Sequence, residues 1–149
     1  MNNFRLIFYS IIGGVSVAGT FITDLLGGWN STLETLIIFM ALDYLTGLIC
    51  SLIFKKSNKS DTGAYDSKIG LKGLFKKVGI LFMILIAARL DLIMNWGQNG
   101  YICKTVTFFF ITNEGLSIVE NLGLIGLPLP NVIKDAFCKL KSYENDKTK

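Results

Sequence analysis

The sequence of 149 residues contains no histidine, only three cysteines and only two prolines. Without histidine, imidazole acid–base catalysis and imidazole metal ligation are both excluded. Three scattered cysteines are too few for a disulfide framework or a thiolate zinc site. Charge is also scarce, because 17% of the residues are charged, whereas a soluble domain carries about 25%. We therefore expect no enzyme, no metal and no cofactor.

Apolar residues are abundant in this sequence. They make up 51% of the chain, which excludes extended disorder. About 20 apolar residues, rising 1.5 Å each, form a helix that crosses a 30 Å hydrocarbon layer. The sequence predicts an all-α integral membrane protein, one domain over residues 1–149. Four stretches are nearly free of charge and predict transmembrane helices over about residues 6–26, 35–54, 78–99 and 105–126.

The predicted spans differ in how readily they insert. The stretch from Thr35 to Phe54 holds 11 Leu, Ile, Phe and Val residues, worth about −3 to −7 kcal/mol against about +3 kcal/mol for Asp43. The third and fourth spans are marginal and need neighbouring helices to satisfy their polar groups. Whether the fourth fully crosses or re-enters stays open.

Lysine positions predict the orientation of the spans. The segment from Lys55 to Lys77 contains seven lysines and the tail from Lys134 onward contains five, whereas residues 27–34 contain none. The positive-inside rule then places both termini and the basic loop 55–77 in the cytoplasm. We expect the loop lysines to meet the anionic inner leaflet; they are Lys55, Lys56, Lys59, Lys68, Lys72, Lys76 and Lys77.

Both ends of the chain leave alternatives open. The first apolar segment, with Ser16-Val17-Ala18, could instead be a cleavable signal peptide. Pro128 and Pro130 end the fourth span. Residues 131–141 then form an amphipathic helix, which either lies on the inner membrane surface or packs against protein.

Two charges within the third span need partners at membrane depth. Arg89 and Asp91 are two residues apart, so they point to different sides of a helix and do not pair with each other. Ionisable residues inside a membrane are costly and mark function or helix pairing. We expect Arg89 to pair with a carboxylate of another helix, either Asp43 or Glu114.

The fourth span has one polar face. At about 100° per residue, its polar residues project within one arc, and the opposite side is apolar. The face either seals the helix bundle or lines an aqueous lesion made by several copies. It consists of Asn113, Glu114, Ser117, Glu120 and Asn121.

Small residues mark two further helix faces. Ser10, Gly14 and Ala18 recur every four residues in the first span, and Gly47 and Ser51 continue this spacing from Asp43 in the second. Small residues allow two helices to approach closely. These faces pack either within the chain or between subunits.

Several runs of residues resemble the toxin-secretion/phage-lysis holin family, which includes clostridial toxin-release proteins and holins of phages of Gram-positive bacteria. The resemblance covers roughly residues 35–140. It is carried by Asp43-Tyr44-Leu45-Thr46-Gly47, Ser67-Lys68-Ile69-Gly70-Leu71-Lys72-Gly73 with Lys76-Lys77, Asp91, Asn113-Glu114-Gly115-Leu116-Ser117-Ile118-Val119-Glu120-Asn121 and Gly126-Leu127-Pro128-Leu129-Pro130.

The resemblance implies a multi-pass protein of the bacterial cytoplasmic membrane that accumulates and oligomerises. Such proteins open non-specific lesions, through which an endolysin or a large toxin leaves the cell. The implied partners are membrane lipid, further copies of the chain and the released protein, with no nucleic acid. A small ion channel or transporter, and a non-conducting membrane adaptor, are the alternatives.

Overall fold

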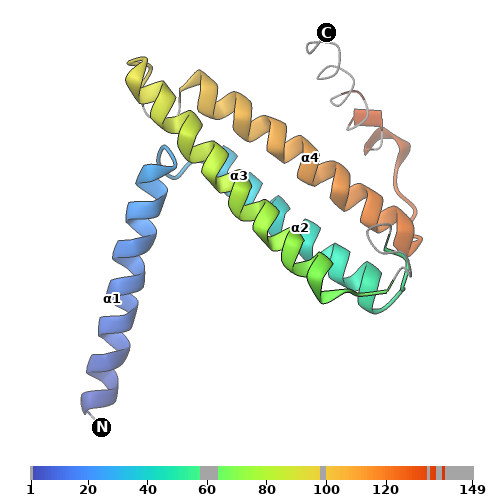
Figure 1. The fold of residues 1–149 in the computed structure, drawn as a ribbon, viewed down its shortest axis with the longest axis horizontal. Coiled ribbons are helices and arrows are strands. Elements are labelled where there is room, and N and C mark those ends of the chain that lie inside the picture. Colours follow the sequence, from blue (N-terminus) through green and yellow to red (C-terminus); the bar gives the residue numbers. More distant parts are fainter. Residues whose placement is uncertain (1, 58–63, 98–99, 134, 137–138, 140–149) are drawn as a thin grey trace.

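The computed structural model describes residues 2–57, 64–97, 100–133, 135–136 and 139. Four α-helices account for most of the described chain, which contains no β-strand (Figure 1). The predicted all-α fold is therefore confirmed. The helices are α1 (Asn2–Leu25), α2 (Ser31–Leu52), α3 (Ser67–Ile93) and α4 (Tyr101–Ile125).

Helices α2, α3 and α4 lie side by side with alternating directions, and α1 extends away from one end of this bundle (Figure 1). Among the described helices, α1 contacts α3 alone. We call the end of the bundle next to Leu25 the α1 end. The opposite end, where α2 stops at Leu52 and α3 starts at Ser67, is the basic end.

Local sequence signals explain where the bundle helices begin and end. The Asn30 side chain accepts hydrogen bonds from two backbone N–H groups in the first turn of α2, at 2.9 and 3.0 Å. The Asp66 carboxylate accepts one from Lys68 N at 2.8 Å at the start of α3. Side-chain oxygens at this position satisfy donors that the helix cannot. Helix α4 ends at Ile125 and is followed by Gly126, whose φ of 93° favours glycine.

Helix α3 differs most from the predicted segments. It begins at Ser67, inside the predicted basic loop, and ends at Ile93, before the predicted limit at residue 99. Asn95 and Gly97 follow it with φ of 59° and 79°, a left-handed conformation that cannot continue the helix.

Three helices, α1, α2 and α4, are long and apolar enough to cross a membrane. The sequence predicts four such segments. Helix α3 does not meet the same standard of composition, because it carries four lysines together with Arg89 and Asp91. The three apolar helices indicate a membrane protein. Whether α3 also spans the membrane depends on where its charged side chains lie.

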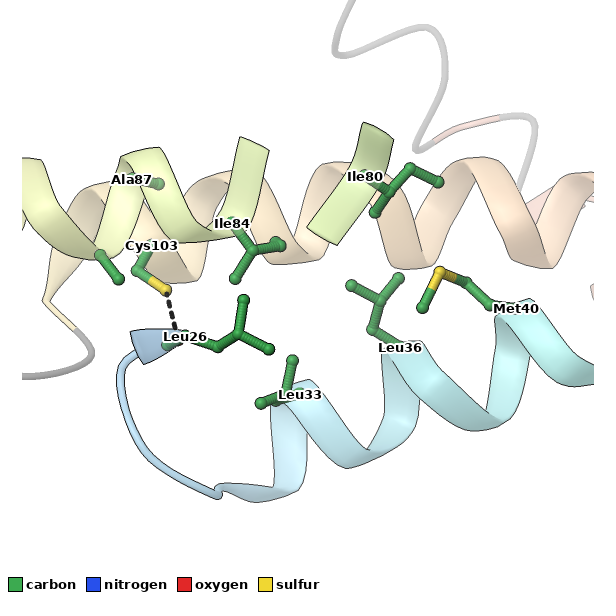
Figure 2. Packing of buried hydrophobic residues seen from close by; sticks show 9 residues of the cluster. Leu26, Leu33, Leu36, Met40, Ile80, Ile84, Ala87 and Cys103 are labelled. Atoms are coloured by element: carbon green, nitrogen blue, oxygen red, sulfur yellow. Dashed lines mark hydrogen bonds between the residues drawn. The ribbon is translucent and has the colours of Figure 1, made fainter. Parts of the chain in front are cut away.

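The apolar core occupies the half of the bundle next to the α1 end. Figure 2 shows Leu33, Leu36 and Met40 of α2 pointing toward the other two helices. Each member of the core is at most 6% exposed. The remaining members are Leu26, Ile80, Ile84, Ala87, Ala88 and Cys103.

Parts of two predicted features fall outside the described residues. The predicted amphipathic helix over residues 131–141 is described only at 131–133, 135–136 and 139, which are helical and exposed. Lys59 of the basic loop also lies outside the described residues.

Candidate functional site

The apolar core is followed by a charged layer. Beyond the core toward the basic end, each bundle helix carries an ionisable side chain: Asp43 on α2, Lys77 on α3 and Glu114 on α4. Asp43 is 8% exposed and Glu114 is 3% exposed. At 1.5 Å per residue, Asp43 lies about 18 Å from the first residue of α2 and about 14 Å from the last. The charged layer is therefore near the middle of this apolar helix.

Lys77 bridges the two carboxylates. Its Nζ lies 2.8 Å from Asp43 Oδ2 and also donates to Glu114 Oε2. The three side chains are at most 12% exposed. A buried charge without a partner costs several kcal/mol, so the shared cation explains how two carboxylates can lie inside the bundle. We call Asp43, Lys77 and Glu114 the ion network.

Asn121 links this network to the neighbouring polar group of α2. Its Nδ2 donates to Asp43 Oδ1 at 3.3 Å and to Thr46 Oγ1 at 3.1 Å. Helices α2 and α4 are close at this point: a Cβ atom built on Gly47 would lie 3.6 Å from Asn121 Nδ2. Gly47 thus lies against α4 within the chain, and Ser51, one turn further on, is also buried.

A cleft between α3 and α4 lies next to the ion network, and Asp43 of α2 also lines it. We call it the polar cleft, after the charged side chains in its wall. Its volume is about 600 Å³. Asn113 and Ser117 are half-buried in its wall, whereas Glu120 is exposed. Its other lining residues are Ile69, Lys72, Gly73, Lys76, Lys77, Glu114 and Leu116. The predicted polar face of α4 is therefore divided between bonds to α2 and α3 and the wall of this cleft.

Asp91, at the α1 end, caps α4 from another helix. Its Oδ1 accepts from Ile102 N at 3.1 Å, and its Oδ2 accepts from Cys103 N at 2.8 Å. Gly100 at the start of α4 has no side chain to supply such a bond. A carboxylate at a helix N-terminus also interacts favourably with the helix dipole. The side chain is 0% exposed, so this role is structural.

Arg89 caps the carboxyl end of α1. Its Nη2 donates to the backbone carbonyls of Leu25 at 2.8 Å and Asp24 at 3.2 Å, in the last turn of α1. The expected pairing of Arg89 with Asp43 or Glu114 is therefore wrong. Those carboxylates lie at the middle of the bundle, whereas Arg89 lies at its α1 end and donates to carbonyls in the last turn of α1.

The remaining predicted site residues are on the surface of the single chain. Ser10, Gly14 and Ala18 of α1 are exposed. So are the described lysines of the segment from Lys55 to Lys77, except Lys77 itself: Lys55, Lys56, Lys68, Lys72 and Lys76. Lys77 differs from the expected lipid-surface position because its side chain points into the bundle.

Sequence reasoning missed the place of Lys77 in the ion network and the bond between Thr46 and Asn121. A signal for Lys77 exists, because counting back from the buried Ile84 and Ile80 in steps of three and four reaches residue 77. Residues with that spacing share one helix face. Among the described residues, no group of three or more Cys, Asp and Glu side chains is placed to hold a metal ion.

The residues that form the network come from three separate runs of the sequence, and the same part of the chain matches a known family. Residues 20–142 match the sequence profile of the bacteriophage holin family. A protein named "Probable holin" from Bacillus phage phi105 is 31% identical over 116 residues, which cover 78% of each chain. This chain belongs to the bacteriophage holin family.

Other relatives of this chain come from bacteria. An uncharacterised protein of Clostridium perfringens strain 13 is 38% identical over 135 residues, covering 90% of this chain and 93% of the relative. The uncharacterised protein YqxH of Bacillus subtilis is 34% identical over 115 residues, covering 77% and 73%. No solved structure matches the chain. Family membership confirms the resemblance found in the sequence and points to a non-enzymatic membrane protein.

Proposed function

We propose that this protein acts as a holin: it accumulates in the bacterial cytoplasmic membrane, oligomerises there and opens non-specific lesions. Through these lesions an endolysin, or a large secreted toxin, leaves the cell. The observation that carries the proposal is a buried ion network, with the polar cleft beside it, in a bundle that exposes many large apolar side chains. Exposed residues such as Leu45 on α2, Phe82 on α3 and Phe108 on α4 suit a lipid environment.

Assembly gives the polar face of α4 a second possible environment. In one chain, Glu114 and Asn121 are bonded to neighbouring helices while Glu120 is exposed. If several copies surround a common lumen, the same face lines water. Because the two arrangements differ in subunit contacts, their balance depends on the amount of protein in the membrane.

The proposal includes α3 as a fourth membrane span. Its 27 residues extend about 40 Å, and it lies alongside α2 and α4 (Figure 1). Three of its charges have partners inside the protein: Lys77 in the ion network, Arg89 on α1 and Asp91 on α4. Charges satisfied in this way do not face hydrocarbon.

With four spans, both termini and the basic loop face the cytoplasm. Lys68, Lys72 and Lys76 lie in the first turns of α3 and are exposed. Long lysine side chains in this position can extend to the interface and meet anionic lipid. We place the amphipathic segment 131–141 on the same inner surface.

Induction of the chain in a bacterial host, with and without a co-expressed endolysin, tests this function. A holin stops respiration and releases a small dye after a delay, and cells lyse only when the endolysin is present. Glu114→Leu and Glu120→Leu should change the delay or abolish lysis, whereas Val119→Leu on the apolar side of α4 should not.

Three other outcomes would contradict the proposal. Growth that continues with the protein in the membrane excludes lesion formation. Flux of one solute without loss of viability indicates a channel or transporter. A stable stoichiometric complex without any change in permeability indicates an adaptor.

A further inference from the structure

The polar cleft runs from the ion network toward the basic end of the bundle. On α3 it is lined from Lys77 back to Ile69, close to the first residue of the helix. On α4 it is lined from Asn113 to Glu120, which lies near the end of that helix. The cleft thus follows the half of the bundle that the apolar core does not fill.

The lining of the cleft favours water over an empty or lipid-filled space. Lys77 and Glu114 form its inner wall, and Lys72, Lys76 and Glu120 lie along its length. Charged groups facing hydrocarbon carry a large desolvation cost. The cleft, with a volume of about 600 Å³, is far larger than the roughly 30 Å³ that one water occupies in the liquid. It therefore has both the room and the partners for several waters.

The opposite half of the bundle blocks further passage. From Met40 and Ile80 to Leu26, the core residues are at most 6% exposed. Leu36, Ile84 and Leu33 fill the space between the helices (Figure 2). Water that enters from the basic end meets this apolar core directly after the ion network.

We propose that the cleft is a hydrated vestibule within a single chain, open at the basic end, which gives water and small ions access to the ion network while the bilayer is intact. The inference deepens the proposed function and rests on it for one point, that the basic end faces the cytoplasm. It makes the polar face of α4 wet before any lesion forms, so assembly widens an existing aqueous space.

Thiol labelling before lesion formation tests this inference. The parent is the full chain with Cys138→Ser, because Cys50 and Cys103 are buried. Ser117→Cys places a thiol in the cleft wall, and Val119→Cys places one two residues away that does not line it. Both are treated with a membrane-impermeant cationic thiosulfonate in inside-out vesicles. A thiolate forms and reacts only where water reaches it, so the Ser117→Cys chain should react at least ten-fold faster.

A second pair of variants guards against a folding defect. A Cβ on Gly73 meets nothing within 4 Å, so Gly73→Cys fits in the cleft wall on α3, and Leu74→Cys is its control outside the lining. Gly73→Cys should also react at least ten-fold faster than its control. Equal rates within a pair, or labelling only in right-side-out vesicles, would overturn the vestibule.

The lysis assay keeps this inference separate from the proposed function. If the cleft cysteines do not react with the reagent but the variants still lyse cells at the normal time, the vestibule is contradicted and the holin function stands. Rapid labelling of a chain that never permits lysis would support the vestibule and contradict the function.

Discussion

The carboxylate of Asp91 lies in contact with the backbone of Gly100. A Cβ atom on residue 100 would be 2.7 Å from both Cγ and Oδ1 of Asp91. The φ of Gly100 is −71°, which any residue adopts, so the glycine is not required by the turn. It is required because a side chain would displace the carboxylate that caps α4.

Gly100→Ala should therefore lower the stability of the bundle. Overpacking a filled site costs about 1–3 kcal/mol, and the cap on α4 weakens as Asp91 moves. Thermal unfolding of the detergent-solubilised protein measures the change. Gly79→Ala on α3 is the control, because nothing lies within 4 Å of its Cβ and alanine favours the helix. Equal melting temperatures for the two variants would contradict this account.

Asp91→Ala should expose the first amides of α4. Without the carboxylate, the N–H groups of Ile102 and Cys103 lose their acceptor. Loss of a cap costs about 1–2 kcal/mol, so we expect these two amides to exchange hydrogen roughly ten-fold faster. Asp91→Asn retains one acceptor oxygen and should give an intermediate rate. Exchange that does not change in the alanine variant would show that other groups satisfy these amides.

The sequence predicts the helices well because each contains a long apolar run. It also identifies Asp43 and Glu114 as buried carboxylates that need a cation. The predicted cation, Arg89, is wrong. Arg89 stands alone in an apolar run and so draws attention, whereas Lys77 lies among other lysines. The choice depends on the register between helices, and no local pattern specifies that register.

The position of α1 is the second feature beyond the reach of the sequence. Ser10, Gly14 and Ala18 predict a close contact with another helix, but in this chain they are exposed. An apolar helix inserts in lipid with or without a protein neighbour, so its composition does not specify what it contacts. The structure fixes only its carboxyl end, through Arg89 and Leu26.

Lys77→Met should destabilise the protein strongly, since it leaves Asp43 and Glu114 buried without a cation. Removing one member of a buried ion pair costs about 3–5 kcal/mol. Chemical denaturation in detergent measures this loss. The control is Lys76→Met, which changes an exposed lysine and should shift stability by no more than about 0.5 kcal/mol.

A triple variant checks that the loss comes from the uncompensated carboxylates. Combining Lys77→Met with Asp43→Asn and Glu114→Gln removes all three charges, and replacing a whole buried ion group is often nearly neutral. We expect the triple variant to recover most of the stability that the single variant loses. A triple variant less stable than Lys77→Met would contradict this explanation.

Arg89→Leu should release the carboxyl end of α1 from the bundle. The substitution removes the donor to the carbonyls of Leu25 and Asp24, which form the main polar contact between α1 and α3. Spin labels at the exposed positions Val15 and Leu45 report the distance between α1 and α2, and its distribution should broaden. Arg5→Leu, near the other end of α1, should leave the distribution unchanged. If Arg89→Leu also leaves it unchanged, apolar packing of Leu26 alone positions α1.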